Sequence, residues 1–375
     1  MTGRSLDGVQ SYTTHGTVTD PAFEKLRAVF EYAVLSRVAH LCAHCCRSNF
    51  ADGLESGASF AVYHRGRLVI SLWGGVANSR HSTEWTENTL TVLFSATKIL
   101  HHQAGLLYSQ EEVTPDHVRD PSKMAAYFER MTPVFPPGSA VGYHALTFGF
   151  LVDQLIRHIH PEGRGVVDVL NEHIILPFED ESVLSRVATV SDPERPHLRG
   201  DCTKEEKERA DEAQRRWASG DNVHNENLYK TWSWIRTSDY NVDANRRLAM
   251  PSNMGLGSAR SLAHFHSLLA TNSLAPFDVD DLVRSGPQLV DHMDVANGYP
   301  ETKGFGWQWS IPPGGTAATQ FGHSGFGGQN VRVDRNRQLA FAYVTNALKQ
   351  ADADLVEPFH RLQRTLYEII DNNID

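Results

Sequence analysis

Alternating apolar and polar positions near both ends of the chain predict β-strands. In Ala58–Gly75, apolar residues alternate with others on either side of Gly66, which is typical of two strands joined by a turn. The segment Gln329–Ala347 repeats this arrangement around the turn "DRNRQ", and Phe305–Ile311 and Ala317–His323 have the pattern of shorter strands. The pattern therefore predicts one sheet to which both ends of the chain contribute, with the C-terminal helix packed on it.

Helical spacing is found in the middle and in the last segment of the chain. The stretch from about Ser95 to Arg260 is predicted to be largely helical, and Ser95 is expected to open a helix running through "SATKILHHQAGLLYSQ". A second helix is expected to follow Tyr143. The apolar positions at three- and four-residue spacing are Phe148, Leu151, Val152 and Leu155 in this second helix, and Leu355, Phe359, Leu362, Leu366 and Ile369 in the last.

These patterns predict an α+β fold in which a helical subdomain is inserted into a sheet. The expected organisation is an N-terminal tail of residues 1–16 followed by a single domain of residues 17–375. The sheet part covers about 47–94 and 260–375, and the helical part about 95–259.

Composition excludes several classes of function. The 375 residues include 35 Lys plus Arg and 45 Asp plus Glu, so the formal charge is 35 − 45 = −10. An acidic chain without a basic stripe argues against a nucleic-acid partner. No segment is long and apolar enough to predict a membrane span, and the N-terminus lacks the apolar core of a secretory signal. A cytoplasmic or other intracellular location is expected, while a homo-oligomer is left open.

Three of the four cysteines crowd into residues 31–46, "EYAVLSRVAHLCAHCC". The cysteines are Cys42, Cys45, Cys46 and Cys202. Such crowding is not typical of a disulfide framework and favours a reducing compartment. A metal site at "CAHCC" is the alternative, but no second ligand pair follows at finger spacing. The sequence therefore predicts a helical segment without a metal, and no cofactor.

Ser95 and Lys98 form a Ser-x-x-Lys pair that can support nucleophilic catalysis. At helical spacing i and i+3 the two side chains share a face. Backbone N–H groups and the dipole at a helix start would favour an attacking alkoxide at Ser95. Burial or a neighbouring cation lowers the pKa of a lysine and allows it to act as a base. Since Ser-x-x-Lys also occurs by chance, two polar residues on an ordinary helix remain the alternative.

Two further segments carry candidate chemistry. Tyr143 follows a Pro/Gly turn at the entry of a helix, where it is either a core residue with its hydroxyl outward or a phenolate-type base beside a lysine. His323, Ser324 and Gly325 end a strand within the glycine-rich "FGHSGFGGQN". Glycines there allow a substrate to lie against the strand edge and backbone N–H groups to point at it, although an ordinary turn is the alternative.

Taken in order, these motifs resemble the signature set of serine β-lactamases and penicillin-binding proteins. The resemblance is nearest the AmpC-type branch and its related carboxylesterases, and among these it looks closest to animal β-lactamase domain-containing proteins. It extends from about residue 17 to the end and is carried by "ADGLESGASFAVYHRGRLVISLWGG", "LFSATK", "HHQAGL", "PPGSAVGYHALTFGFLVDQLI", "NMGLGSARSLAHFHSLLA" and "FGHSGFGGQNVRVDRNRQLAFAYVTNA".

The resemblance implies an acyl-enzyme mechanism on a small-molecule ester or amide. Ser95 would be the nucleophile, Lys98 and Tyr143 would share the base work, and His323 would stand where penicillin-binding relatives carry lysine. The backbone N–H groups of Ser95 and Phe326 would form the oxyanion hole. Substrate would contact Ser324 and Gly325.

The chain departs from the family pattern in both its motifs and its length. "YHA" at 143–145 lacks the asparagine of Tyr-x-Asn, and "HSG" replaces Lys-Thr-Gly, so the resemblance implies an esterase-like or peptidase-like hydrolase rather than an antibiotic-destroying one. In the family a long helix separates the Ser-x-x-Lys from the "HxAGL" segment, whereas "ILHHQAGL" follows Lys98 directly here. Several tens of residues are therefore missing after Lys98, residues 31–46 look added, and a smaller loss is expected around Asn171–Ser182.

Three functional readings follow from the sequence. The first is a serine hydrolase of the acyl-transfer type. The second is a catalytically inactive scaffold or filament-forming relative. The third is a non-functional splice or gene-model variant without a stable fold.

Overall fold

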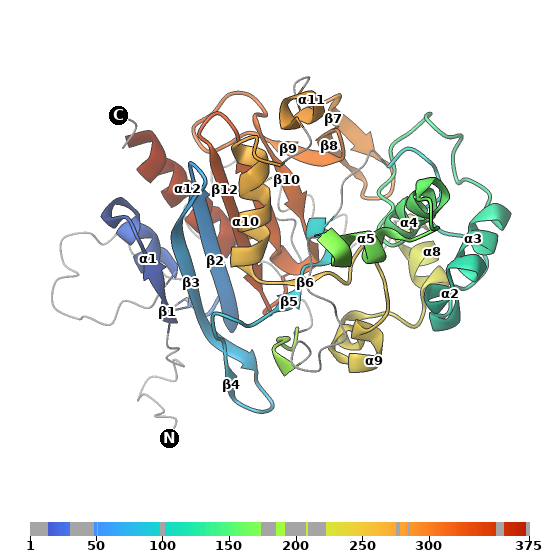
Figure 1. Cartoon of the computed structure of the whole chain (residues 1–375), viewed down its shortest axis with the longest axis horizontal. Helices are drawn as coiled ribbons and strands as arrows, with labels where there is room; N and C mark the ends of the chain where they lie inside the picture. Colours follow the sequence, from blue (N-terminus) through green and yellow to red (C-terminus); the bar gives the residue numbers. More distant parts are fainter. Residues whose placement is uncertain are drawn as a thin grey trace.

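The computed structural model describes residues 14–30, 49–50, 52–97, 102–173, 185–191, 208, 223–274, 278–283, 286–349 and 356–372. Within these ranges a large antiparallel sheet lies beside a separate group of helices (Figure 1). Outside the described residues lie Lys98, the four cysteines, the segment 31–46, residues 174–184, and all but residue 208 of the charged stretch 204–221.

The sheet joins both ends of the chain, and the predicted topology is confirmed. Its order is β1, β3, β2, β12, β11, β10, β9, β8 and β7, with neighbouring strands antiparallel. The strands are β1 (Thr14–Val18), β2 (Gly57–His64), β3 (Arg67–Asn78), β7 (Leu289–Asp294), β8 (Tyr299–Gly304), β9 (Trp307–Ser310), β10 (Gln320–Ser324), β11 (Asn330–Asp334) and β12 (Leu339–Thr345). Short β4 (Thr83–Glu84) pairs with β3, while β5 (Thr91–Val92) and β6 (Leu256–Gly257) form a separate pair.

Three strands of this sheet lie outside the predicted ones. β1 pairs with β3 and begins inside the segment 1–16 that the sequence suggested as a tail. β7 and β8 form a hairpin whose turn contains Asn297 and Gly298, with φ of 74° at the glycine. The connection has four residues, 295–298, and of its Asn-Gly pair only the glycine has positive φ, a conformation that glycine adopts without steric cost. This hairpin matters for the site described below.

The two faces of the sheet bury different side chains. In β2, Phe60 and Val62 belong to one core cluster, whereas the alternate residues Ala61 and Tyr63 belong to another. The aromatic face packs against α12 (Glu357–Asn372) and α1 (Glu24–Phe30), which follows the 3₁₀ turn η1 (Pro21–Phe23). The opposite face packs against α10 (Ala259–Ala270), and Figure 1 shows α10 in front of the sheet with α12 behind it.

Small residues explain how closely α10 can pack on the sheet. Ala61 and Ala342 on the strands share a buried cluster with Ala259 and Ala263 of the helix. Ser258 caps this helix by accepting a hydrogen bond from the N–H of Ser261. Both sheet faces are therefore covered, as a strand that is apolar on both sides requires.

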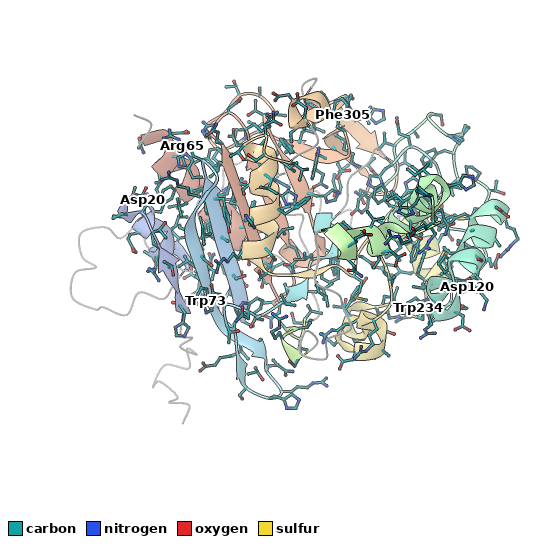
Figure 2. The ribbon with its side chains drawn as sticks, in the orientation of Figure 1. Asp20, Arg65, Trp73, Asp120, Trp234 and Phe305 are labelled. Atoms are coloured by element: carbon teal, nitrogen blue, oxygen red, sulfur yellow. The ribbon has the colours of Figure 1, made fainter. Side chains whose placement is uncertain are left out.

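The helical group has its own core. Its helices are α2 (Pro115–Arg119), α3 (Pro121–Arg130), α4 (Thr147–Ile159), α5 (Val166–His173), α8 (Val223–Thr231) and α9 (Asp243–Arg246), with the 3₁₀ turn η3 (Thr237–Asn241); α11 (Val279–Val283) lies near β7. Asp120 and Trp234 both lie in this group (Figure 2). Asp120 caps α3 by accepting the N–H groups of Ser122 and Lys123, and Trp234 donates its indole N–H to the carbonyl of Val113 at 2.7 Å.

The helix predicted from Ser95 through Gln110 is wrong. Ser95 lies in the short 3₁₀ turn η2 (Phe94–Thr97), and residues 102–114 contain no helix. His102 has a φ of 51° and Gly105 a φ of 73°, which is incompatible with a right-handed helix. A Cβ at residue 105 would lie 2.4 Å from the carbonyl oxygen of Phe135, so the close approach of the 130s segment fixes this loop.

The apolar stripe predicted for α4 is partly wrong. Phe148 is buried, but Leu155 is 57% exposed. Leu151 and Val152 are only partly buried. The helix itself forms where the spacing predicts it, so the periodicity located the element but not every residue of its packed face.

His266 on α10 should make folding sensitive to acid. Burial lowers the pKa of His266 to about 4, against a smaller opposing effect of its hydrogen bond to the Leu262 carbonyl. Below about pH 6.5 the histidine binds a proton in the unfolded chain but stays neutral in the folded chain. The free energy of unfolding therefore decreases as the pH falls from about 6.5 towards about 4. In chemical denaturation, His266→Gln should reduce the loss of unfolding free energy between pH 7 and 4.5 by about 2–3 kcal/mol.

His264→Gln, on the exposed side of the same helix, is the matched control for removal of a histidine. An equal loss of stability with pH in wild type and His266→Gln would contradict this assignment.

Candidate active site

Tyr143 and His323 lie together, although 180 positions separate them in the chain. Their rings are 6.1 Å apart between centroids and nearly parallel, with an interplanar angle of 29°. A second histidine, His102, contacts Tyr143 with a centroid distance of 4.8 Å. The ammonium nitrogen of Lys303 lies 5.5 Å from the centroid of the Tyr143 ring. Tyr143 is thus surrounded by three nitrogen-bearing side chains.

Ser95 lies in a turn that links the sheet to the helical group. Its neighbour Phe94 is buried in the helical core and has a φ of 47°. The Phe94 ring packs edge-on against Phe326, at 5.6 Å between centroids. The turn η2 also contacts β10, the strand that carries His323. Ser95 therefore occupies the side of β10 from which the glycine-rich turn follows, while Lys98 lies outside the described residues.

The glycine-rich turn after β10 has a backbone that other residues rarely adopt. In the 3₁₀ turn η4 (Phe326–Gly328), Gly327 has a φ of 81° and Gly328 a φ of 114°. A Cβ at residue 327 would lie 2.5 Å from Cδ2 of Leu348, which is fully buried. Glycine is thus required at position 327 on both conformational and steric grounds. This turn fixes the backbone of Phe326, one of the two expected oxyanion donors.

Neighbouring groups already hold His323, Ser324 and Gly325. The Nδ1 of His323 donates to the carbonyl of Ser324 at 2.6 Å, since that carbonyl can only accept. The N–H and hydroxyl of Ser324 both donate to Oε1 of Gln308, at 2.9 Å each. The N–H of Gly325 donates to the carbonyl of Gln329 at 2.7 Å. These contacts preorganise the end of β10, and the expected substrate role of Ser324 and Gly325 remains a prediction.

His102 and His144 are locked by backbone hydrogen bonds. The N–H of Leu106 donates to Nε2 of His144 at 3.1 Å, so its proton sits on Nδ1, which donates to the carbonyl of Gly142 at 2.6 Å. The N–H of His144 in turn donates to Nδ1 of His102 at 3.1 Å. Both histidines therefore brace the loop around Tyr143 against the segment that follows residue 101.

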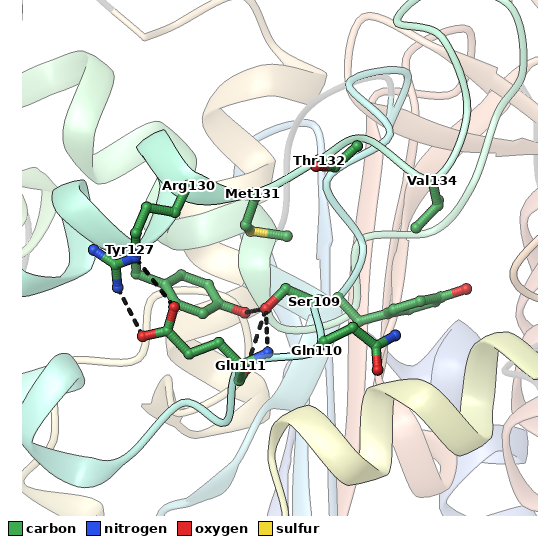
Figure 3. Close-up of a pocket in the computed structure, with 9 residues that line it drawn as sticks. Ser109, Gln110, Glu111, Tyr127, Arg130, Met131, Thr132 and Val134 are labelled. Atoms are coloured by element: carbon green, nitrogen blue, oxygen red, sulfur yellow. Dashed lines mark hydrogen bonds and ion pairs between the residues drawn. The ribbon is translucent and has the colours of Figure 1, made fainter.

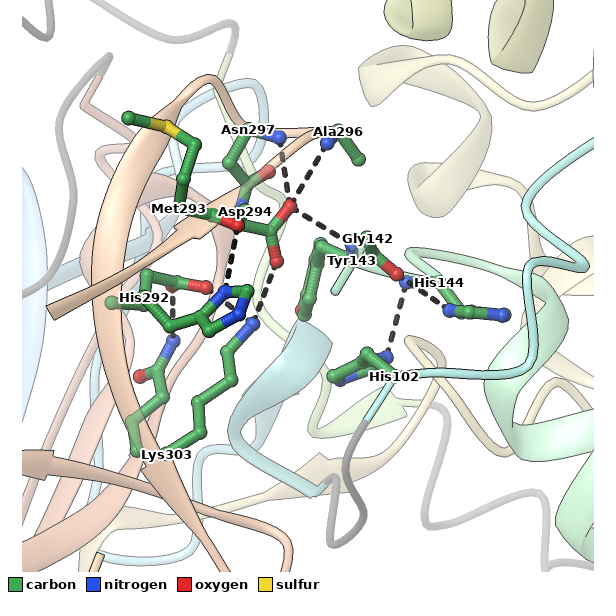
Figure 4. Close-up of polar contacts among 12 residues, drawn as sticks. His102, Gly142, Tyr143, His144, His292, Met293, Asp294, Ala296, Asn297 and Lys303 are labelled. Carbon is green, nitrogen blue, oxygen red and sulfur yellow. Dashed lines mark hydrogen bonds and ion pairs between the residues drawn. The ribbon is translucent and has the colours of Figure 1, made fainter. Parts of the chain in front are cut away.

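A buried carboxylate holds the backbone of Tyr143 from the sheet side. Oδ1 of Asp294 accepts the N–H groups of Tyr143, Ala296 and Asn297, each at 3.0 Å (Figure 4). Its other oxygen accepts from Nζ of Lys303 at 2.8 Å. Asp294 is fully buried, so these four donors replace the water that a carboxylate otherwise requires.

Lys303 is buried between two carboxylates. Its Nζ forms ion pairs with Asp294 and Glu301, and its side chain is 5% exposed. Burial by itself lowers the pKa of Lys303, but the charges of Glu301 and Asp294 outweigh it, so the pKa is raised above the ordinary value. Lys303 therefore presents a permanent cation to the face of Tyr143.

The helix α8 closes the same region from the helical side. Nδ1 of His224 and the hydroxyl of Tyr108 share a hydrogen bond of 2.8 Å. Burial lowers the pKa of His224, while the charge of Asp294 acts in the opposite direction. Tyr108 belongs to a small apolar cluster that also contains Tyr143 and Ala296. His224 is therefore part of the electrostatic environment of the Asp294–Lys303 pair.

A separate cavity of about 360 Å³ lies on the helical group between residues 108–111 and 127–134 (Figure 3). On its wall Arg130 makes a two-pronged ion pair with Glu111, with N–O distances of 2.7 and 3.2 Å. The hydroxyl of Tyr127 donates to Oγ of Ser109 at 3.0 Å. Ser95, Tyr143 and His323 do not line this cavity, so it is distinct from the candidate site.

The sequence singled out Tyr143 and His323 but not the groups that hold them. Asp294, Lys303 and His224 carry no motif, and only the Asn-Gly turn at 297–298 indicated a hairpin that would place Asp294 and Lys303 on paired strands. No cluster of three metal-ligating side chains occurs in the described part of the chain. No described helix is long and apolar enough to cross a membrane.

This chain matches the model of a known protein family. The Beta-lactamase family model matches residues 46–101 and 99–365. The two matched blocks meet at 99–101, the junction where the sequence suggested missing residues, and the first begins at the end of the segment 31–46. No curated protein matches the chain.

Several solved structures are similar. A penicillin-binding-protein homologue from Caulobacter crescentus is 25% identical with a TM-score of 0.70, and the match covers 95% of this chain and 100% of that one. A family VIII carboxylesterase is 22% identical with a TM-score of 0.72, covering 95% and 100%. EstA from Arthrobacter nitroguajacolicus Rue61a is 21% identical with a TM-score of 0.69, covering 96% and 100%. These likenesses support the predicted β-lactamase and transpeptidase-like fold.

Two glycine substitutions should separate backbone strain from crowding in the turn after β10. Gly327 and Gly314 have φ of 81° and 75°, but a Cβ at residue 314 meets nothing within 4 Å. Gly314→Ala should cost about 1–2 kcal/mol for the left-handed backbone alone. Gly327→Ala should cost a further ~1–3 kcal/mol because its methyl group overpacks against Leu348.

Equilibrium denaturation of both variants measures this difference. Equal losses for the two alanines would mean that Leu348 does not confine the turn.

Proposed function

Because the chain belongs to the Beta-lactamase family, we propose that it is a serine hydrolase acting through an acyl-enzyme on a small ester or amide. In this proposal Ser95 is the nucleophile, and Tyr143 and Lys98 together act as the general base. His323 assists, in the place where penicillin-binding relatives carry lysine. The observation that carries the proposal is the contact of Tyr143 with His323 on the strand that also adjoins the Ser95 turn.

The acylation step follows from these assignments. The oxygen of Ser95 forms a bond to the substrate carbonyl carbon while its proton passes to the base formed by Tyr143 and Lys98. Collapse of the tetrahedral intermediate breaks the bond to the alcohol or amine, which takes that proton as it leaves. The N–H groups of Ser95 and Phe326 would stabilise the oxyanion between these two events.

Deacylation uses the same groups in reverse. Water gives a proton to the base and attacks the acyl carbon, and Ser95 recovers its proton when the carboxylic acid departs. His323 adjoins Tyr143 and is fixed by its hydrogen bond to the Ser324 carbonyl. Its suggested part is to orient the substrate or pass a proton, so its loss should matter less than loss of the base.

The motif departures favour an ester or a peptide-like substrate over a lactam antibiotic. Ala145 stands where the family pattern Tyr-x-Asn has an asparagine that recognises an amide. His144 cannot replace that asparagine as a substrate ligand, because both its ring nitrogens are occupied by Leu106 and Gly142. The carboxylesterases among the structural neighbours are consistent with this choice.

Covalent labelling by a serine-directed phosphonate tests the proposal directly. Ser95→Ala should abolish labelling, because the probe reacts with the nucleophilic oxygen. Lys98→Ala and Tyr143→Phe should each slow labelling by about 10²–10⁴-fold, the usual effect of losing a general base. His323→Gln should slow it less. Mass spectrometry of the labelled peptide locates the adduct.

Ser109→Ala is the matched control, since this serine lies at the separate cavity on the helical group. Labelling that persists in Ser95→Ala would reject the assignment of the nucleophile. A folded wild-type protein that is not labelled at all would instead favour the scaffold reading, and an absence of cooperative unfolding would favour the non-functional variant.

A further inference from the structure

We propose that Lys303 and Asp294 form a charged clamp that positions Tyr143 and sets, in opposite directions, the pH at which its phenol loses a proton. The clamp is built from the β7–β8 hairpin, which contains both residues (Figure 4). Asp294 accepts a hydrogen bond from the backbone N–H of Tyr143, and the ammonium group of Lys303 lies over the tyrosine ring. Both are positioning residues that act through Tyr143. The use of Tyr143 as a base rests on the proposed function.

The geometry separates the clamp from an ordinary surface ion pair. Asp294 has no exposed side-chain surface and Lys303 is 5% exposed, so solvent screens neither charge strongly. Removal of water from an ion pair is costly unless hydrogen bonds replace it, and here three backbone N–H groups and the lysine do so for Asp294. The pair therefore keeps a fixed geometry around Tyr143.

The charge of Lys303 favours the ionised form of Tyr143. A cation 5.5 Å from the ring centroid is attracted by the π face and more strongly by a phenolate, which carries a full negative charge. The carboxylates oppose this effect, because a negative charge nearby disfavours a second one. The clamp thus contains one group that promotes loss of the proton and one that resists it.

Other titratable groups adjoin the same ring and are taken into account in the choice of pH range. They are His102 and His323 against the ring, Glu301 beyond Lys303, His224 beside Asp294, and Tyr108 in the apolar cluster with Tyr143. The proposed function adds Lys98, which shares the role of base with Tyr143. Histidines titrate near pH 6.5 and an ordinary tyrosine near 10, so measurements above pH 8 report on the phenol. The raised pKa of Lys303 keeps the cation present in that range.

The test compares Lys303→Met with Asp294→Asn in the full chain. Ionisation of Tyr143 is followed by phenolate absorbance near 295 nm, as the difference between each protein and the same protein carrying Tyr143→Phe. Lys303→Met should move the transition to higher pH by about one unit or more, because the cation is lost. Asp294→Asn should move it to lower pH, because the amide oxygen can still accept the Tyr143 N–H while the negative charge is gone.

Opposite shifts distinguish electrostatic action from a structural role. A clamp that only held Tyr143 in place would move both variants in the same direction or not at all, and either result overturns the proposal. Lys303→Arg keeps the cation and should return the transition towards the wild-type pH. If Lys303→Met does not fold, comparison of Glu301→Gln with Glu301→Gln/Lys303→Met removes the lysine charge without leaving Glu301 charged and unpaired.

Labelling with the serine-directed phosphonate keeps the two proposals separable. At neutral pH, a one-unit upward shift lowers the phenolate fraction tenfold, so Lys303→Met should be labelled about tenfold more slowly than wild type. Absence of labelling in wild type together with opposite absorbance shifts would reject the serine hydrolase and leave the clamp standing. Normal labelling together with unchanged absorbance transitions would do the reverse.

Discussion

The pairing of β2 with β12 is the constraint on which the other features depend. It joins residues 58–64 to 339–345, so the two ends of the chain form the centre of one sheet. Side-chain contacts reinforce the joint: the single hydroxyl proton of Thr345 is shared between Oε2 of Glu55, at 2.7 Å, and the carbonyl of Gly57, at 3.1 Å, across 290 and 288 positions. Bringing such distant segments together costs loop-closure entropy, which burial of both sheet faces must offset.

The sheet centre then decides where the candidate chemistry lies. The turn η2 that carries Ser95 follows β5, which comes after β3 and β4 in the chain, and β11 lies between β12 and β10, which carries His323. The helical group supplies Tyr143 from the start of α4, and Phe94 anchors η2 within the helical core. The candidate site thus lies where the sheet and the helical group meet, and Phe326 and Leu348 from the sheet part also pack into the helical core. A change in either core would alter the distance between the serine turn and the tyrosine.

The buried charges of Asp294, Glu301 and Lys303 at the β7–β8 hairpin are not expected to stabilise the fold. Buried ions cost several kcal/mol each in lost hydration, and their attraction often only restores that loss. A lysine between two carboxylates next to an aromatic ring therefore contributes less to folding stability than apolar side chains of the same size would. Its value lies in a defined position and a defined field at Tyr143, which no apolar replacement would supply.

The sequence by itself determined the sheet from both chain ends, the terminal helix α12, and the motif set with Tyr143 and His323. Apolar residues at spacings of two, or of three and four, mark the buried face of a strand or helix. These patterns can be recognised without knowing which element packs against that face. They failed at residues 102–110, where the helical spacing continues through a described loop. There the close approach of Phe135 to Gly105, and the positive φ of His102, override local preference.

Only the tertiary structure decided how Tyr143 is held. The hydrogen bond from its N–H to Asp294 spans 151 positions, and a single backbone donor leaves no periodic trace in a sequence. The same holds for the contact of Lys303 with the tyrosine ring, since any charged residue on a strand first suggests a solvent-facing position. The periodicity of a sequence indicates which side chains are buried. The partner of a buried charge depends on which strands and helices pack together in the folded chain.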